Sequence, residues 1–201
     1  MTKKILATGA VLLAVSLGAA LAQDKGGKGG GGGGKGPAVP GMGLSSPDFQ
    51  DGGIIPDKFT QVAGATAPSP KLEWTNVPMG TVSFVLIFHD PDNAMQKGPE
   101  DTLHWMAFNI PGTAKGLDGG VPATATLPDG TINAKNVRGG VGYMGPGNGA
   151  INPYHHYTFE LYALDTKLSL TPDATRAEVM EAMKGHAIGK AVLSGRFKRP
   201  N

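Results

Sequence analysis

Thr81–Asp92 reads TVSFVLIFHDPD, and this stretch decides the fold. Its first nine residues are rich in β-branched and aromatic side chains and are apolar almost without interruption. Such a run is typical of a strand that is buried on both faces. Two aspartates then flank a proline, which makes the strand exit a rigid polar turn. This turn is a first candidate site, although aspartates in turns often only accept backbone N–H groups.

Three more strands are predicted. Leu103–Ile110 (LHWMAFNI) is a second apolar run and is closed by Pro-Gly. His156–Leu164 (HYTFELYAL) alternates between apolar and polar residues, with Tyr157 and Tyr162 in or near one face. Ala191–Phe197 is the last predicted strand.

One helix is predicted near the C-terminus. Thr175–Glu178 (TRAE) is a capping box, in which each end residue's side chain accepts from the other's backbone N–H. Ala177, Met180 and Met183 follow at spacings of three, and we expect this stripe to pack on the core. Gly185 stands where a left-handed residue would end the helix. Several long strands with one late helix favour a mainly β, antiparallel architecture.

Two further polar clusters lie near predicted strand ends. His104 precedes Trp105 within a strand, and neighbouring strand residues face opposite sides. If Trp105 packs in the core, we therefore expect His104 on the other face. The second cluster is the loop Tyr143–Gly149 (YMGPGNG), whose glycines suit either close approach to an anion or a plain flexible turn.

The N-terminal region indicates an export leader followed by a spacer. Met1–Ala22 has two lysines, a short apolar stretch and an Ala-Leu-Ala ending. The apolar stretch is shorter than the ~20 residues that span a bilayer, so cleavage as a signal peptide is favoured over a membrane anchor. Residues 23–43, almost all Gly, Lys and Pro, are predicted to be a disordered tether, and residues 44–201 the folded domain. The mature protein is expected outside the cytoplasmic membrane, in a periplasm or in the medium, without a stable membrane span.

Composition excludes several classes of function. The chain of 201 residues contains no cysteine, which rules out disulfides, thiolate metal sites, a cysteine nucleophile and a lipid anchor on cysteine. After residue 43 there are 13 Lys and Arg against 15 Asp and Glu. Because this part of the chain has no excess of basic charge, no nucleic-acid partner is expected.

The order of these motifs is similar to that of the phosphatidylethanolamine-binding family, and within it to the bacterial branch labelled Raf kinase inhibitor-like or YbhB/YbcL. The resemblance is carried by DPD at 90–92, HW at 104–105, GPG at 145–147 and PYHHYTFELYALD at 153–165. It extends from about Leu44 to Arg199. It implies a large antiparallel sheet packed on a smaller one, with short helices near the C-terminus.

The resemblance also implies that the polar clusters converge on one cavity. Its ligand would be an anion such as phosphate or a phospholipid headgroup of the phosphoethanolamine type. His156 corresponds to a variable position and is expected outside the cavity, and Asp92 could hold the turn instead of contacting a ligand. Carried over by position, the ligand-binding residues are Asp90, Asp92, His104, His155 and Tyr157, with Gly145 and Pro146 as the rim. His155 and Tyr157 share one strand face by the period of two.

We therefore expect an exported, non-enzymatic binding protein with no cofactor and no metal. Imidazolium, tyrosine hydroxyl and backbone N–H groups are the donors that phosphate oxygens accept, so binding should weaken as the pH rises past about 6.5. One alternative is an inhibitor or interaction module whose pocket rim docks a protein partner in the envelope. Another is a metal-assisted phosphoester hydrolase, but the sequence has neither a G-x-S-x-G elbow nor an H-E-x-x-H motif.

Overall fold

The computed structural model describes residues 41–94 and 98–201, so the predicted leader and the tether up to residue 40 lie outside the described residues. The strands of the larger sheet are β3 (Ser83–Ala94), β4 (Asp101–Pro111), β6 (Ile132–Asn133), β7 (His155–Leu164) and β8 (Ala187–Phe197). Those of the smaller sheet are β1 (Gly43–Ser45), β2 (Leu72–Thr75) and β5 (Gly116–Leu117). The helical elements are the 3₁₀ turns η1 (Asp57–Phe59) and η2 (Gln61–Ala63) and the helix α1 (Arg176–Ala182).

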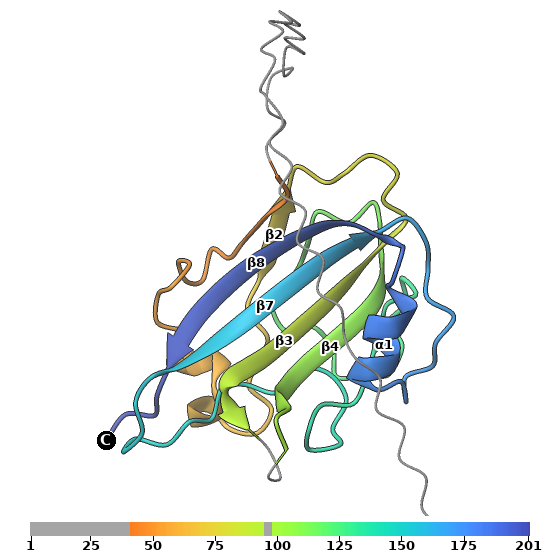
Figure 1. Cartoon of the computed structure of the whole chain (residues 1–201). Coiled ribbons are helices and arrows are strands. Elements are labelled where there is room, and N and C mark those ends of the chain that lie inside the picture. The colour runs from red at the N-terminus through yellow and green to blue at the C-terminus, as the bar shows by residue number, and fades with distance from the viewer. Residues whose placement is uncertain (1–40, 95–97) are drawn as a thin grey trace, which may run out of the picture. The chain divides into compact units, whose positions relative to one another are not determined.

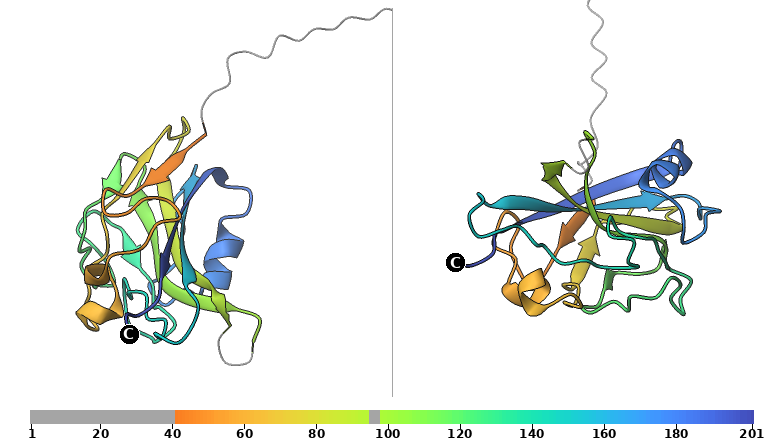
Figure 2. Two further views of the ribbon diagram at one scale, coloured as in Figure 1. Left: turned by 90° about the vertical axis from the view of Figure 1, so that its left-hand side faces the viewer. Right: turned by 90° about the horizontal axis from the view of Figure 1, so that it is seen from below.

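The two sheets lie face to face, and α1 covers the outer face of the larger one (Figure 1; Figure 2). The strand order is β6-β4-β3-β7-β8 in the large sheet and β1-β2-β5 in the small sheet, and every strand pair is antiparallel. This confirms the predicted mainly β fold, with one α-helix in the described part of the chain. β1 begins at Gly43, one residue before the predicted start of the domain.

β3 is apolar throughout because both of its faces are covered. Phe84, Leu86 and Phe88 point into the inner core between the two sheets. Val85 and Ile87 point the other way, into an outer core beneath α1. All five side chains are fully buried, and each such burial stabilises the fold by about 1.5–3 kcal/mol. The central strand of the large sheet is thereby fixed between two cores.

Helix α1 begins as predicted but buries a different face. Thr175 is the N-cap, and the reciprocal capping box with Glu178 is formed. The buried residues are Val179 and Met183, whereas Ala177 and Met180 are exposed. Residues three apart drift around a helix by about 60° per step, so a stripe at that spacing cannot stay on one face. The predicted stripe was wrong except at Met183.

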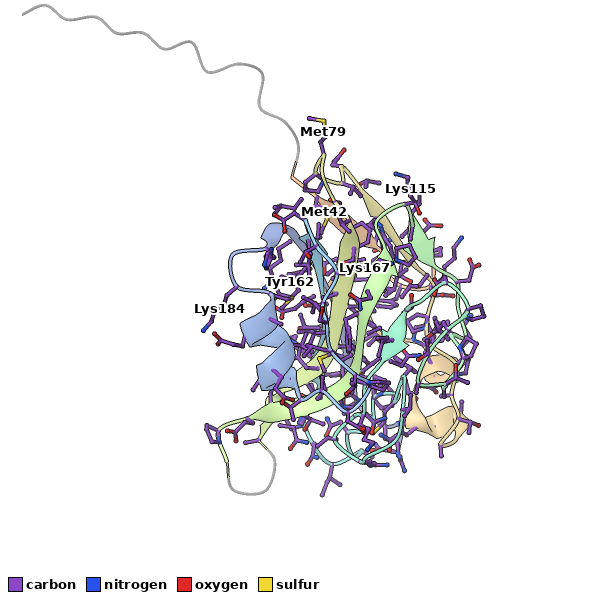
Figure 3. The ribbon with its side chains drawn as sticks, turned by 90° about the vertical axis from the view of Figure 1, so that its right-hand side faces the viewer. Met42, Met79, Lys115, Tyr162, Lys167 and Lys184 are labelled. Atoms are coloured by element: carbon purple, nitrogen blue, oxygen red, sulfur yellow. The ribbon has the colours of Figure 1, made fainter. Side chains whose placement is uncertain are left out.

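β7 places alternate aromatic residues on opposite sides of the large sheet. Tyr157 and Phe159 are part of the inner core. Tyr162 instead packs against the outer core, on the same side of the sheet as α1 (Figure 3). Its grouping with Tyr157 on one face of this strand was therefore wrong. The two residues are an odd number of positions apart, and successive strand residues face opposite sides of the sheet.

Candidate ligand-binding site

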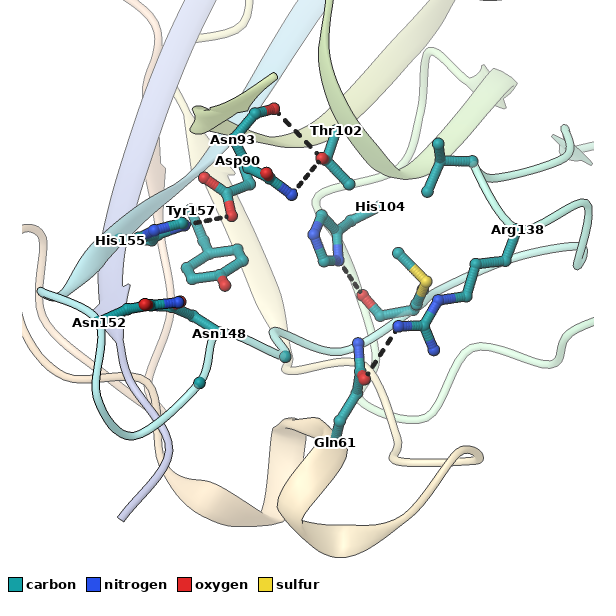
Figure 4. Close-up of a pocket in the computed structure, with 14 residues that line it drawn as sticks. Gln61, Asp90, Asn93, Thr102, His104, Arg138, Asn148, Asn152, His155 and Tyr157 are labelled. Carbon is teal, nitrogen blue, oxygen red and sulfur yellow. Dashed lines mark hydrogen bonds and ion pairs between the residues drawn. The ribbon is translucent and has the colours of Figure 1, made fainter. Parts of the chain in front are cut away.

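A cavity of about 240 Å³ lies beyond the strand ends on one side of the large sheet, where β3 ends and β4 and β7 begin (Figure 4). Its size suits a small ion or headgroup better than a ligand of drug size. It is lined by Gln61, Asp90, Asn93, Thr102, His104, Val137, Arg138, Met144, Gly147, Asn148, Gly149, Asn152, His155 and Tyr157. The structure thus brings together four of the seven predicted site residues: Asp90, His104, His155 and Tyr157.

Asp90 and His155 form a buried pair between β3 and β7. The Nδ1 atom of His155 lies 2.8 Å from Oδ2 of Asp90, and the two side chains are 16% and 3% exposed. The other carboxylate oxygen of Asp90 accepts the backbone N–H of Asp92 at 3.0 Å. An acceptor at Nδ1 places a proton on that nitrogen, so Asp90 fixes the orientation of the imidazole and leaves Nε2 for a ligand.

A β-bulge in β4 turns His104 toward this cavity. Phe88 of β3 pairs with Trp105 of β4, and the next residue, His89, pairs with Leu103. His104 is therefore an extra residue in β4 that has no paired residue in β3. Trp105 lies in the inner core and His104 lines the cavity on the same side of the sheet. The expectation that the two side chains face opposite sides was wrong, because strict alternation holds only where the register is regular.

The imidazole of His104 is held by the Tyr143–Gly149 loop. Its Nδ1 atom lies 2.8 Å from the carbonyl oxygen of Met144, to which it donates. Burial lowers the pKa of His104 below its ordinary value of 6.5, the Met144 carbonyl and the Asp90 carboxylate oppose this, and the charge of Arg138 adds to the lowering. The ring is therefore neutral at pH 7, with its proton on Nδ1 and a lone pair on Nε2.

Tyr157 supplies a hydroxyl group that stays protonated. Burial raises its pKa above the ordinary value of 10, and the negative charge of Asp90 raises it further. The backbone N–H groups of Asn148 and Gly147 act in the opposite direction, because they would hydrogen-bond a phenolate oxygen. A neutral phenol beside two backbone N–H groups makes this part of the cavity rich in hydrogen-bond donors.

Gly145 and Pro146 hold the loop from behind instead of forming the rim. Their carbonyl oxygens accept hydrogen bonds from Gln61, at 2.9 Å from its side-chain amide and at 2.8 Å from its backbone N–H. A Cβ atom on Gly145 would lie only 2.7 Å from the carbonyl oxygen of Phe59, so this contact requires glycine. The loop residues that line the cavity are Met144 and Gly147–Gly149.

Asp92 and His156 lie outside the cavity and pair with each other. Oδ2 of Asp92 accepts the backbone N–H of His156 at 2.6 Å and lies 2.9 Å from its Nδ1 atom. The backbone N–H of His156 lowers the pKa of Asp92. Both side chains are about half exposed. The expectation that Asp92 faces a ligand therefore fails: its carboxylate links β3 to β7.

The main residue that sequence reasoning missed is Arg138. Among the described residues that line the cavity, it alone carries a fixed positive charge. The side chain of Asn136 accepts the backbone N–H groups of Arg138 and Gly140 and so forms the turn that presents the arginine. Nη2 of Arg138 lies 3.4 Å from Oε1 of Gln61, 77 positions earlier in the chain. Asn136 with Gly-Gly at 139–140 signals a turn, but no local pattern shows which cavity the turn faces.

The described residues offer no assembled metal-ligand set. No three His, Asp or Glu side chains among them lie close enough together to hold a metal ion. Of the acids in the predicted site, Asp92 points away from the cavity and pairs with His156, and Asp90 is engaged by His155.

Sequence similarity to known proteins extends over almost the whole domain. Residues 45–198 match the sequence profile of a family described as phosphatidylethanolamine-binding protein. A UPF0098 protein of Methanothermobacter thermautotrophicus is 40% identical over 158 residues, which cover 79% of this chain and 99% of the relative. The candidate lipoprotein LppC of Mycobacterium tuberculosis is 35% identical over 163 residues, which cover 81% of this chain and 75% of the relative.

Two crystal structures share the fold, each with a TM-score of 0.69. The first is CT736 of Chlamydia trachomatis, described as a homologue of phosphatidylethanolamine-binding protein; it is 31% identical, with 79% of this chain and 98% of that chain covered. The second is Escherichia coli YbcL, described as a member of the mammalian family; it is 25% identical, with 80% and 99% covered. Two facing sheets with a polar cavity at one edge define a β-rich class of binding protein. The chain belongs to the phosphatidylethanolamine-binding protein family.

Proposed function

We propose that the protein binds a small anion of the phosphate type in the cavity beside Asp90 and His104. The observation that supports this is the convergence of two imidazoles, a neutral phenol, an arginine and backbone N–H groups on one hollow of about 240 Å³. Inorganic phosphate and a phosphoethanolamine headgroup present the same oxygens to these donors. The phosphoethanolamine headgroup also carries an ammonium group, from which the carboxylate of Asp90 would accept a hydrogen bond.

Charge balance predicts that binding takes up a proton. Asp90 places a negative charge in the cavity and Arg138 a positive one, so a bound dianion leaves an excess of negative charge that favours an additional positive charge there. His104 provides it if Nε2 is protonated, and the lowered pKa of this residue means that the free protein is not protonated there at pH 7. The affinity for a dianion should therefore rise as the pH falls, until His104 is already protonated in the free protein.

Sulfate tests this, because unlike phosphate it keeps the same charge between about pH 5 and pH 7.5. Calorimetry should show an affinity that falls by up to about tenfold per pH unit over this range, as expected when one proton is taken up. His104→Gln should flatten the dependence, and His156→Gln, outside the cavity, should leave it unchanged. Equal wild-type affinities at both ends of the range would refute the role of His104. Absence of binding of both sulfate and phosphate would refute the anion site.

Binding without turnover is the function that we propose for this cavity. Among the described residues that line it, no serine or cysteine stands beside the Asp90–His155 pair to act as a nucleophile. A second candidate is docking of a protein partner at the rim. It is favoured by the apolar side chain of Ile151, which is 99% exposed in the loop next to the cavity, with Tyr154 close by in the chain.

We also propose that the protein acts outside the cytoplasm, in a periplasm or in the medium. The leader pattern of Met1–Ala22 supports this, as does the similarity to a candidate lipoprotein. No helix in residues 41–94 or 98–201 has the length and apolarity that crossing a bilayer would need. Because the chain has no cysteine, it would lack a lipid anchor of the cysteine-linked kind. A protein partner, if one is engaged, would then belong to the envelope.

A further inference from the structure

A second cavity, of about 450 Å³, adjoins the anion cavity. It is formed by residues 65–69, by residues 120–123 without Pro122, and by the loop that carries Arg138. Small or apolar side chains make up most of its wall, among them Ala65, Ala67, Val121 and Ala123. A cavity of this size and lining suits an apolar group better than a second ion.

Three residues are common to the walls of both cavities: Gln61, Arg138 and Met144. Figure 4 shows Gln61 and Arg138 on the side of the anion cavity that lies away from Asp90 and His155. Their hydrogen bond is 3.4 Å long and solvent-exposed, so little free energy holds it closed. The Met144 side chain is itself adaptable. Gln61 is also held by the Gly145 carbonyl, at 2.9 Å from its side-chain amide, so Arg138 and the Met144 side chain are the parts of the partition that would move for a ligand to extend across it.

We propose that the second cavity receives the apolar substituent of the ligand whose anionic group occupies the first. The ligand class is a phosphate monoester with a short alkyl or aryl group, and this inference rests on the proposed anion site. The phosphate would lie near Tyr157 and the loop N–H groups. Arg138, at the junction, would contact its oxygens from the other side, and the substituent would pass beyond Arg138 toward Ala123.

Calorimetry with inorganic phosphate and phenyl phosphate, at one pH, tests the proposal. Phenyl phosphate should bind at least about tenfold more tightly, because a ring that leaves water for an apolar cavity gains that much or more. Ala123→Phe fills the second cavity from an exposed position that does not line the first. It should abolish the advantage of phenyl phosphate and leave the affinity for inorganic phosphate unchanged. Thr124→Phe, at the next exposed position and lining neither cavity, is the matched control and should change neither affinity.

The outcomes separate this inference from the function on which it rests. If inorganic phosphate binds and phenyl phosphate binds no more tightly, the second cavity is not a substituent site, but the anion site stands. If neither binds, both fail. If Ala123→Phe weakens both ligands equally, or weakens neither, the inference is also overturned. Ala65→Phe fills the same cavity from a different segment and decides the question should Ala123→Phe not fold.

Discussion

The carboxylate of Asp90 influences the ionisation of two other side chains in the cavity. The pKa of His104 is lowered mainly by burial, and Asp90 opposes this by stabilising the imidazolium. The pKa of Tyr157 is raised mainly by burial, and Asp90 raises it further by repelling the phenolate. Replacing Asp90 with Asn removes the charge and keeps the shape of the side chain. The pKa values of His104 and Tyr157 should therefore both fall.

The His104 part of this prediction is measured by NMR titration of its ring protons in the wild type and in Asp90→Asn. Asp92→Asn is the matched control, because Asp92 is an aspartate of the same turn whose carboxylate faces away from the cavity and pairs with His156. It should leave the His104 titration unchanged. A His104 pKa that stays the same or rises in Asp90→Asn would show that the two groups do not interact as the geometry requires.

The loop over the cavity keeps its position by packing against η1 and η2. In Gly145→Ala the added methyl group would lie 2.7 Å from the carbonyl oxygen of Phe59 and 2.9 Å from Cα of Thr60. These are backbone atoms that cannot rotate away, so we expect a loss of about 1–3 kcal/mol in the free energy of unfolding. Urea denaturation measures this loss, and anion affinity should fall with it because the loop N–H groups would shift.

A second glycine of the same loop provides the control. In Gly149→Ala the nearest atom is the side-chain amide nitrogen of Asn152 at 3.5 Å, an ordinary contact, and the backbone does not require positive φ there. The change in stability should stay within about 0.5 kcal/mol. Equal effects of the two substitutions would mean that the close approach at Gly145 does not fix the loop.

The elements were predictable from sequence where local patterns determine them. The apolar run of β3, the alternation in β7 and the capping box of α1 are local, and each of these elements is present. The bulge at His104 is a property of how two strands pair, so a rule based on alternation placed that side chain on the wrong face. Arg138 and Gln61 meet only because η2 and a loop distant from it in the chain pack together. The residues that complete the cavity are thus the ones that sequence periodicity could not locate.

The whole chain combines a near-neutral folded domain with an N-terminal segment that the sequence predicts to be an export leader and a tether. The described residues that line the anion cavity all lie from Gln61 to Tyr157. Removal of the leader should therefore leave ligand binding unchanged, and export can be tested separately from it. Expressed in full in a bacterium, the chain should be recovered outside the cytoplasm with Gln23 as its first residue, as mass spectrometry of the intact protein would show.

Two substitutions test whether signal peptidase makes this cut. Ala22→Leu puts a large side chain at the position just before the bond, where the peptidase requires a small one, so the uncut chain should accumulate. Leu21→Ala changes the neighbouring position, which tolerates many residues, and should be processed normally. An uncut wild-type chain that stays in the cytoplasm would contradict export. The anion site would be untouched by that result, but its ligand would then have to be sought among cytoplasmic phosphate compounds and not among those of the envelope.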